Sequence, residues 1–210
     1  MATTAKICGL STPETLDAAM AGGASHVGFV FFPPSPRDVE PERAAQLAAR
    51  LPGHVGRVGV FVDPEDDLLA RTIPMLSAVQ LHKVTPQRAA AIRQRFGRDT
   101  WVAVPVRTRA DLDAAQAYKD AADRILYDAK TPDDAALPGG MGLRFDWTLL
   151  DGFAHPLPWA LSGGLDPANV PDAIGRTGAR LVDVSSGVES APGVKDVDKI
   201  AAFLQAVARS

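Results

Sequence analysis

The chain has 210 residues, 46% of them hydrophobic, and its 22 basic and 25 acidic side chains give a formal net charge of −3. This length can bury a substantial core, and the high apolar fraction with a low net charge excludes intrinsic disorder. The chain lacks the excess of basic residues that would favour nucleic-acid binding. Its single cysteine, Cys8, excludes an intrachain disulfide and a cysteine-rich zinc site.

Short apolar runs recur along the chain, and each is followed by turn residues and a helical pattern. We expect strands at 5–8, 26–31, 57–62, 78–82, 101–106, 124–128, 159–162 and 180–184. Most runs are continuously apolar, as in parallel strands covered on both faces. A capping side chain before proline predicts helix starts at Thr12-Pro13, Asp63-Pro64, Thr85-Pro86 and Asp166-Pro167.

Eight strands alternating with helical segments predict an α/β fold, a single-domain (β/α)8 TIM barrel over residues 1–210. A doubly wound open sheet is the alternative. The eight units leave no room for extra antiparallel strands, which favours closure. No linker-like stretch divides the chain.

The beginning of the chain lacks the basic and apolar segments of a signal peptide, and apolar stretches such as 27–32 are too short to span a bilayer. We therefore expect a cytoplasmic protein with no membrane or nucleic-acid partner.

Glycine-rich segments follow the last two predicted strands. Gly163 and Gly164 come after the seventh, and Ser185, Ser186 and Gly187 come after the eighth. Adjacent loops of this kind form the recurrent phosphate site of such barrels, where backbone N–H groups bind a dianion. Tight turns alone would also explain the glycines, but two consecutive loops favour phosphate binding.

Two candidates for acid–base chemistry stand at strand ends. A lone cysteine such as Cys8 is most often a small buried hydrophobe, but at the end of the first strand it would face the barrel mouth, where a thiolate could act as a base. Lys6 shares its face of the strand and could assist ionisation or simply pair with a carboxylate. Asp128 ends the sixth strand, as a loop-ordering carboxylate or as a general acid kept protonated by burial.

Other polar residues are candidate substrate contacts. Arg37 follows the second strand and is either a surface residue or the group that binds a substrate carboxylate. Gln80 and His82 end the fourth strand, and we expect His82 to be structural. The remaining histidines are scattered and predict no metal cluster.

Several short motifs, in order over nearly the whole chain, resemble those of the phosphoribosylanthranilate isomerase family of tryptophan biosynthesis. They are Lys6-Ile7-Cys8-Gly9, Ser35-Pro36-Arg37, Gln80-Leu81-His82, Leu126-Tyr127-Asp128, Phe145-Asp146-Trp147, Ser162-Gly163-Gly164-Leu165, Asp183-Val184-Ser185-Ser186-Gly187-Val188-Glu189 and Gly193-Val194-Lys195-Asp196. Three positions depart from the family pattern: Lys83 where glycine is usual, Met141 in the loop after the sixth strand, and Tyr127 where an aliphatic residue is usual.

The resemblance implies a cofactor-free Amadori rearrangement of N-(5′-phosphoribosyl)anthranilate to 1-(2-carboxyphenylamino)-1-deoxyribulose 5-phosphate. By position, Asp128 would be the general acid, Cys8 the general base, Arg37 the anthranilate carboxylate ligand and Asp183 a contact of the opened sugar. A monomer or homodimer acting on a small phosphosugar is expected.

Two alternatives remain. A related aminoaldose isomerase of histidine biosynthesis would use an aspartate where Cys8 stands. A non-catalytic phospho-ligand-binding barrel would have no need for both Cys8 and Asp128.

Overall fold

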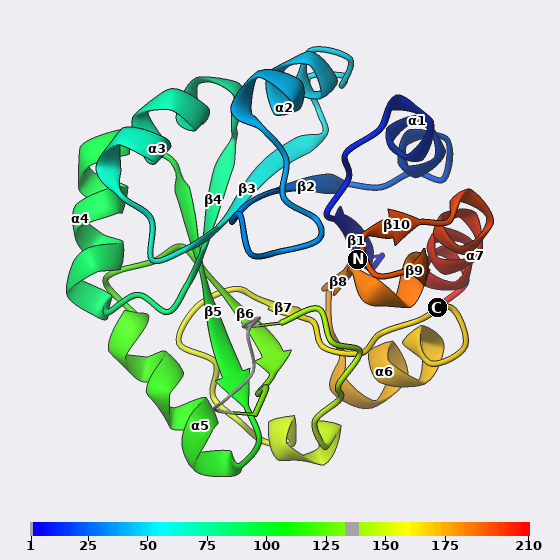
Figure 1. The fold of residues 1–210 in the computed structure, drawn as a ribbon. Helices are drawn as coiled ribbons and strands as arrows, with labels where there is room; N and C mark the ends of the chain where they lie inside the picture. The colour runs from blue at the N-terminus through cyan, green and yellow to red at the C-terminus, as the bar shows by residue number, and fades with distance from the viewer. Residues whose placement is uncertain (1, 133–138) are drawn as a thin grey trace.

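Eight parallel strands close into a barrel in chain order, and β8 pairs with β1 (Figure 1). The computed structural model describes residues 2–132 and 139–210. The strands are β1 (Thr4–Cys8), β2 (His26–Phe31), β3 (Gly56–Val62), β4 (Ala78–His82), β5 (Asp99–Val106), β6 (Arg124–Ala129), β7 (Trp159–Leu161) and β8 (Leu181–Val184). The predicted (β/α)8 barrel is confirmed, and the open sheet is wrong.

Helices surround the barrel, as Figure 1 shows. They are α1 (Pro13–Ala21), α2 (Pro41–Ala48), α3 (Asp66–Thr72), α4 (Pro86–Phe96), α5 (Arg109–Asp113), α6 (Val170–Thr177) and α7 (Val197–Ala208), with 3₁₀ turns η1 (Ile73–Met75), η2 (Ala114–Tyr118), η3 (Trp147–Leu150) and η4 (Ser186–Val188). None of the helices in the described ranges has the length and apolar character needed to cross a membrane.

Two of the four predicted helix starts are confirmed. The Thr12 and Thr85 hydroxyls accept hydrogen bonds from the third backbone N–H beyond them and cap α1 and α4. The start at Asp63-Pro64 is wrong because Asp63 turns in a left-handed conformation (φ 42°) and α3 begins only at Asp66. The start at Asp166-Pro167 is wrong because the Asp166 carboxylate closes a turn with the N–H groups of Ala168 and Asn169, and α6 begins at Val170.

The expectation of no further antiparallel strands is also wrong. Strands β9 (Glu189–Ala191) and β10 (Val194–Lys195) form a small antiparallel hairpin between β8 and α7. The hairpin makes its own two-stranded sheet, so the barrel closes without interruption.

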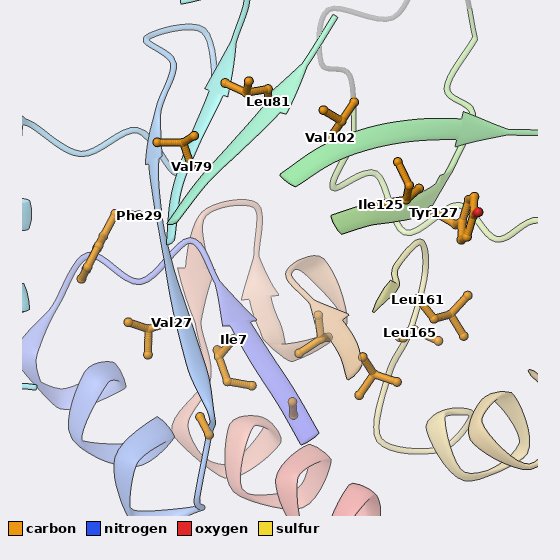
Figure 2. Close-up of a cluster of buried hydrophobic side chains, with 14 of the residues drawn as sticks. Ile7, Val27, Phe29, Val79, Leu81, Val102, Ile125, Tyr127, Leu161 and Leu165 are labelled. Carbon is orange, nitrogen blue, oxygen red and sulfur yellow. The ribbon is translucent and has the colours of Figure 1, made fainter. Parts of the chain in front are cut away.

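Strand alternation sorts the side chains into two layers. Residues such as Ile7, Val27, Phe29, Leu81 and Tyr127 point outward and pack beneath the helices in the larger hydrophobic core (Figure 2). Their neighbours in sequence point inward. The inward apolar residues form a second buried cluster of Val58, Ala78, Trp101, Ala103, Leu126, Ala160 and Leu181.

The two layers position the site. Each inward apolar residue is followed two positions later, on the same face of its strand, by a residue nearer the carboxyl end. At Ala78, Leu126, Ala160 and Leu181 these residues are the polar Gln80, Asp128, Ser162 and Asp183. The fold therefore gathers polar groups at the carboxyl-end mouth of the barrel, above an apolar floor.

Candidate active site

A pocket of about 560 Å³ opens at the carboxyl ends of the strands. Its lining brings together residues from β1, β2, β3, β4, β6 and β8 and from the loops after β2, β6, β7 and β8: Cys8, Val30, Phe32, Ser35, Arg37, Val60, Val62, Gln80, His82, Asp128, Gly139, Gly140, Ser162, Asp183 and Ser185. Valines on β2 and β3 make one wall apolar, while the opposite wall carries carboxylates and hydroxyls.

Asp128 is a buried carboxyl group whose pKa lies well above the ordinary value for aspartate. Burial, and secondarily the negative charge of Asp183, raise the pKa of Asp128 to about 7. One oxygen accepts a hydrogen bond from the N–H of Ala129 at 2.9 Å. Gly163 (φ 91°) lies beneath the same group, and a Cβ there would approach Asp128 Oδ1 to 3.1 Å. A buried acid of this kind can donate a proton at physiological pH.

Cys8 lies on the same pocket with a thiol that is almost fully buried. Burial raises the pKa of Cys8, and the ammonium of Lys6 opposes that shift. Lys6 donates to Asp183 Oδ1 at 2.7 Å, and Ser162 donates to the other oxygen of Asp183 at 3.2 Å. Of the two roles open to Lys6, pairing with a carboxylate is therefore present in the structure.

Arg37 is buried and not a surface residue. Its Nε and Nη2 donate to the two oxygens of Glu189 at 2.7 and 2.8 Å, and Nη2 also donates to the carbonyl of Gly140. Lys195 binds Glu189 as well, at 2.7 Å. The hairpin β9–β10 thus fixes the guanidinium at the pocket edge, and Nη1 makes no hydrogen bond to the residues in the ranges 2–132 and 139–210.

Gln80 and His82 form one hydrogen-bonded unit on β4. Gln80 Nε2 and His82 Nε2 lie 3.0 Å apart, and burial with the charge of Lys6 lowers the pKa of His82 to about 4. A neutral imidazole that bonds Gln80 fits the structural role expected of His82. Gln80 lines the pocket, and its buried Oε1 has no hydrogen-bond partner within the described part of the chain.

Three of the five residues predicted to bind phosphate line a neighbouring hollow. They are Gly164, Ser186 and Gly187, and Arg37 lines both this hollow and the first pocket. Ser185 lines the first pocket and donates to the carbonyl of Cys8 at 3.3 Å. Gly163 lies beside Asp128.

Sequence reasoning assigned no role to Glu189, Lys195 or Ser162. Glu189 and Lys195 both fall within the family-like motifs. Their opposite charges lie on either side of Pro192-Gly193, a pattern that could have predicted an ion pair across a hairpin turn. Among the described ranges, 2–132 and 139–210, no group of three or more His, Cys, Asp or Glu side chains is placed to hold a metal ion.

The three departures have separate structural settings. Lys83 adopts a left-handed conformation (φ 56°), which explains why glycine suits that position. The Tyr127 side chain packs against Phe153 and Trp159 outside the barrel, with its hydroxyl 3.1 Å from His155 Nδ1. Met141 is half exposed and lines the second hollow.

Known proteins are similar to this chain in sequence and in fold. A sequence model described as N-(5′-phosphoribosyl)anthranilate (PRA) isomerase matches residues 5–206. The N-(5′-phosphoribosyl)anthranilate isomerase of Zymomonas mobilis subsp. pomaceae is 57% identical over 99% of both chains.

Solved structures agree. The dimeric phosphoribosyl anthranilate isomerase of Thermotoga maritima superposes with a TM-score of 0.87 at 38% identity over 98% of both chains. A structure of such an enzyme in complex with reduced 1-(o-carboxyphenylamino)-1-deoxyribulose 5-phosphate superposes with a TM-score of 0.82 at 36% identity, again over 98% of both chains.

Fold and site together define a TIM-barrel protein in which a buried carboxyl group and a thiol face one pocket at the carboxyl ends of the strands. The sequence match then fixes the family: the chain belongs to the phosphoribosylanthranilate isomerases. This confirms the resemblance and disfavours both the histidine-pathway isomerase and the non-catalytic barrel.

Proposed function

We propose that this protein isomerises N-(5′-phosphoribosyl)anthranilate and that Asp128 and Cys8 carry out the two proton transfers. The reaction is an aldose–ketose isomerisation in tryptophan biosynthesis, and its product is 1-(2-carboxyphenylamino)-1-deoxyribulose 5-phosphate. The observation that supports the roles is the pairing, on one pocket, of a carboxyl group with a pKa raised to about 7 and the single thiol of the chain.

Asp128 acts first, as the general acid. Its proton passes to the furanose ring oxygen, the C1′–O bond breaks, and the nitrogen lone pair forms the C1′=N iminium. The desolvated carboxyl suits this step because its pKa of about 7 lets a large fraction of the protein carry the proton at neutral pH.

Cys8 acts second, as the general base. The thiolate takes the C2′ proton, and the C–H electron pair forms the C1′=C2′ bond of an enolamine, which neutralises the iminium. The enolamine then tautomerises to the ketone. The whole sequence moves protons only, so it calls for no redox group.

Other pocket residues are proposed to hold the substrate. The guanidinium of Arg37 suits the anthranilate carboxylate, and the valine wall suits its ring. Asp183 and Gln80 face the sugar region. Ser186, Gly164 and Gly187 line the proposed phosphate position, Ser185 adjoins it in sequence on the first pocket, and Gly163 supports it through the loop that it shares with Gly164.

We further propose that the chain forms one domain over residues 1–210 and acts on a small phosphosugar as a monomer or homodimer. We also propose that the protein is cytoplasmic. The dimeric Thermotoga relative supports the dimer, and membership of a biosynthetic family supports the location.

The test generates the labile substrate in situ and follows its fluorescence with purified protein. We expect the fluorescence to disappear with wild type and the rate to fall by on the order of 10² or more with Asp128→Asn. No loss with wild type would contradict the function. Near-normal turnover of the variant would contradict the role of Asp128 alone.

A further inference from the structure

Lys6 is a buried charged residue for which the reaction above gives no task. Its side chain is fully buried, and it forms an ion pair with Asp183. Such a pair is weak evidence for stability, because the cost of desolvating both charges offsets their attraction and an apolar pair often fills the same space equally well. Its location suggests a chemical reason for keeping the charge.

The ammonium group of Lys6 lies beside the Cys8 thiol. Both side chains point inward from β1, and both face Gly28 on β2. A Cβ placed on Gly28 would come within 2.9 Å of Cys8 Sγ and 3.2 Å of Lys6 Cε. The missing side chain of Gly28 therefore leaves a space that both the Lys6 side chain and the Cys8 sulfur border, and the positive charge of Lys6 lowers the pKa of the thiol.

Among the described residues, the cations beside the pocket outnumber the carboxylates paired with them. Lys6, Lys195 and Arg37 are paired with two carboxylates, Asp183 and Glu189. His82, with a pKa lowered to about 4, is neutral at pH 7, whereas Asp128, with a pKa raised to about 7, is only partly ionised there. These groups keep a net positive charge, which a thiolate at Cys8 would offset.

We propose that Lys6 is a positioning residue that stabilises Cys8 as the thiolate, the form that can take the C2′ proton. The inference rests on the proposed role of Cys8 as the base. Lys6 keeps its own proton throughout, because Asp183 holds it in the ammonium form. During the step the C2′–H bond breaks and an S–H bond forms. The negative charge of the thiolate is lost, and the electron pair of the C2′–H bond neutralises the iminium to give the enolamine.

The two members of the ion pair act on Cys8 in opposite directions. The positive charge of Lys6, and more weakly that of Lys195, lowers the pKa of the thiol, whereas the negative charge of Asp183 raises it. Replacing Lys6 and replacing Asp183 should therefore have effects of opposite sign on Cys8. Simple loosening of the barrel would expose the thiol in both variants and change both in the same sense.

The test measures alkylation of Cys8 by iodoacetamide as a function of pH, which is unambiguous because the chain has one cysteine. We expect Lys6→Met to move the midpoint to higher pH and slow alkylation at pH 7 by about tenfold. Asp183→Asn should move the midpoint to lower pH. Lys119→Met, at an exposed lysine, serves as the control. Midpoints that shift in the same direction, or an unchanged midpoint in Lys6→Met, would overturn the proposal.

If a single variant does not fold, the double variant Lys6→Met/Asp183→Asn leaves neither charge unpaired. Because Lys6 outweighs Asp183 at the thiol, we expect slower alkylation than in wild type. Equal or faster alkylation would overturn the inference. The readout needs no turnover, so a failed role for Lys6 is distinguishable from a failed role for Cys8, which only the activity of Cys8→Ala would reveal.

Discussion

Ionisation of the buried Asp128 should lower the free energy of unfolding as the pH rises, and the variant Asp128→Asn should lack this pH dependence. The pKa of the group is about 7 in the folded protein against the ordinary value of 3.8, mainly because of burial. A folded-state pKa that is raised means that the contribution to stability is complete below the unfolded value and is lost as the pH rises through the folded one. Above pH 7 the folded protein must hold a buried carboxylate.

The pKa difference corresponds to about 4 kcal/mol in the free energy of unfolding over the whole titration, of which about 2–3 kcal/mol falls between pH 5 and pH 8.5. Asparagine has nearly the same shape and cannot ionise. We expect the stability of Asp128→Asn relative to wild type to increase by that amount over this range, measured by urea denaturation at both pH values.

The pH dependence of the difference is the informative quantity, because any fixed cost of the asparagine cancels. Asp120→Asn, at an exposed carboxylate, controls for the loss of a surface charge. A difference between Asp128→Asn and wild type that is the same at pH 5 and pH 8.5 would refute the argument that burial keeps Asp128 protonated.

Three further predictions concern positions around the site. Arg37→Ala should raise KM more than it lowers kcat, because the guanidinium is proposed to bind the substrate carboxylate; steady-state kinetics with an unchanged KM would exclude that role. Glu189→Gln should lower the free energy of unfolding by about 3–5 kcal/mol, because it leaves the buried Arg37 and Lys195 without their carboxylate; a denaturation midpoint equal to that of wild type would contradict this. Lys83→Gly should raise the free energy of unfolding by about 1 kcal/mol, because glycine tolerates the left-handed backbone there, and a loss of stability in thermal melts would count against it.

The barrel strands and several residues of the candidate site could be predicted from the apolar runs and from positions at the strand ends. Continuous apolar runs located all eight barrel strands, and Cys8, Gln80, Asp128 and Asp183 stood out because they lie at or near the carboxyl ends of those runs. The barrel rule that strand carboxyl ends share one mouth then placed those residues together. These signals are local in sequence or general to the fold, so the order of the amino acids is enough to recognise them.

Contacts between residues far apart in the sequence could not be predicted from these local patterns. Glu189 meets Arg37 across 152 positions of sequence, and no local pattern specifies such a pair. The start of α3 was missed for a related reason, since the N–H of Asp63 donates to the carbonyl of His82 and keeps that residue with the strands. The choice between the two roles of Lys6 likewise depended on Asp183 opposite it on β8.

The turnover of Cys8→Ala tests the central claim most directly. The variant removes only the sulfur at the end of β1 and leaves Asp128, Arg37 and the proposed phosphate loops in place. With substrate generated in situ, we predict that kcat falls by on the order of 10² or more while a product analogue still binds. Near-normal turnover in a folded Cys8→Ala variant would show that the thiol is not the base.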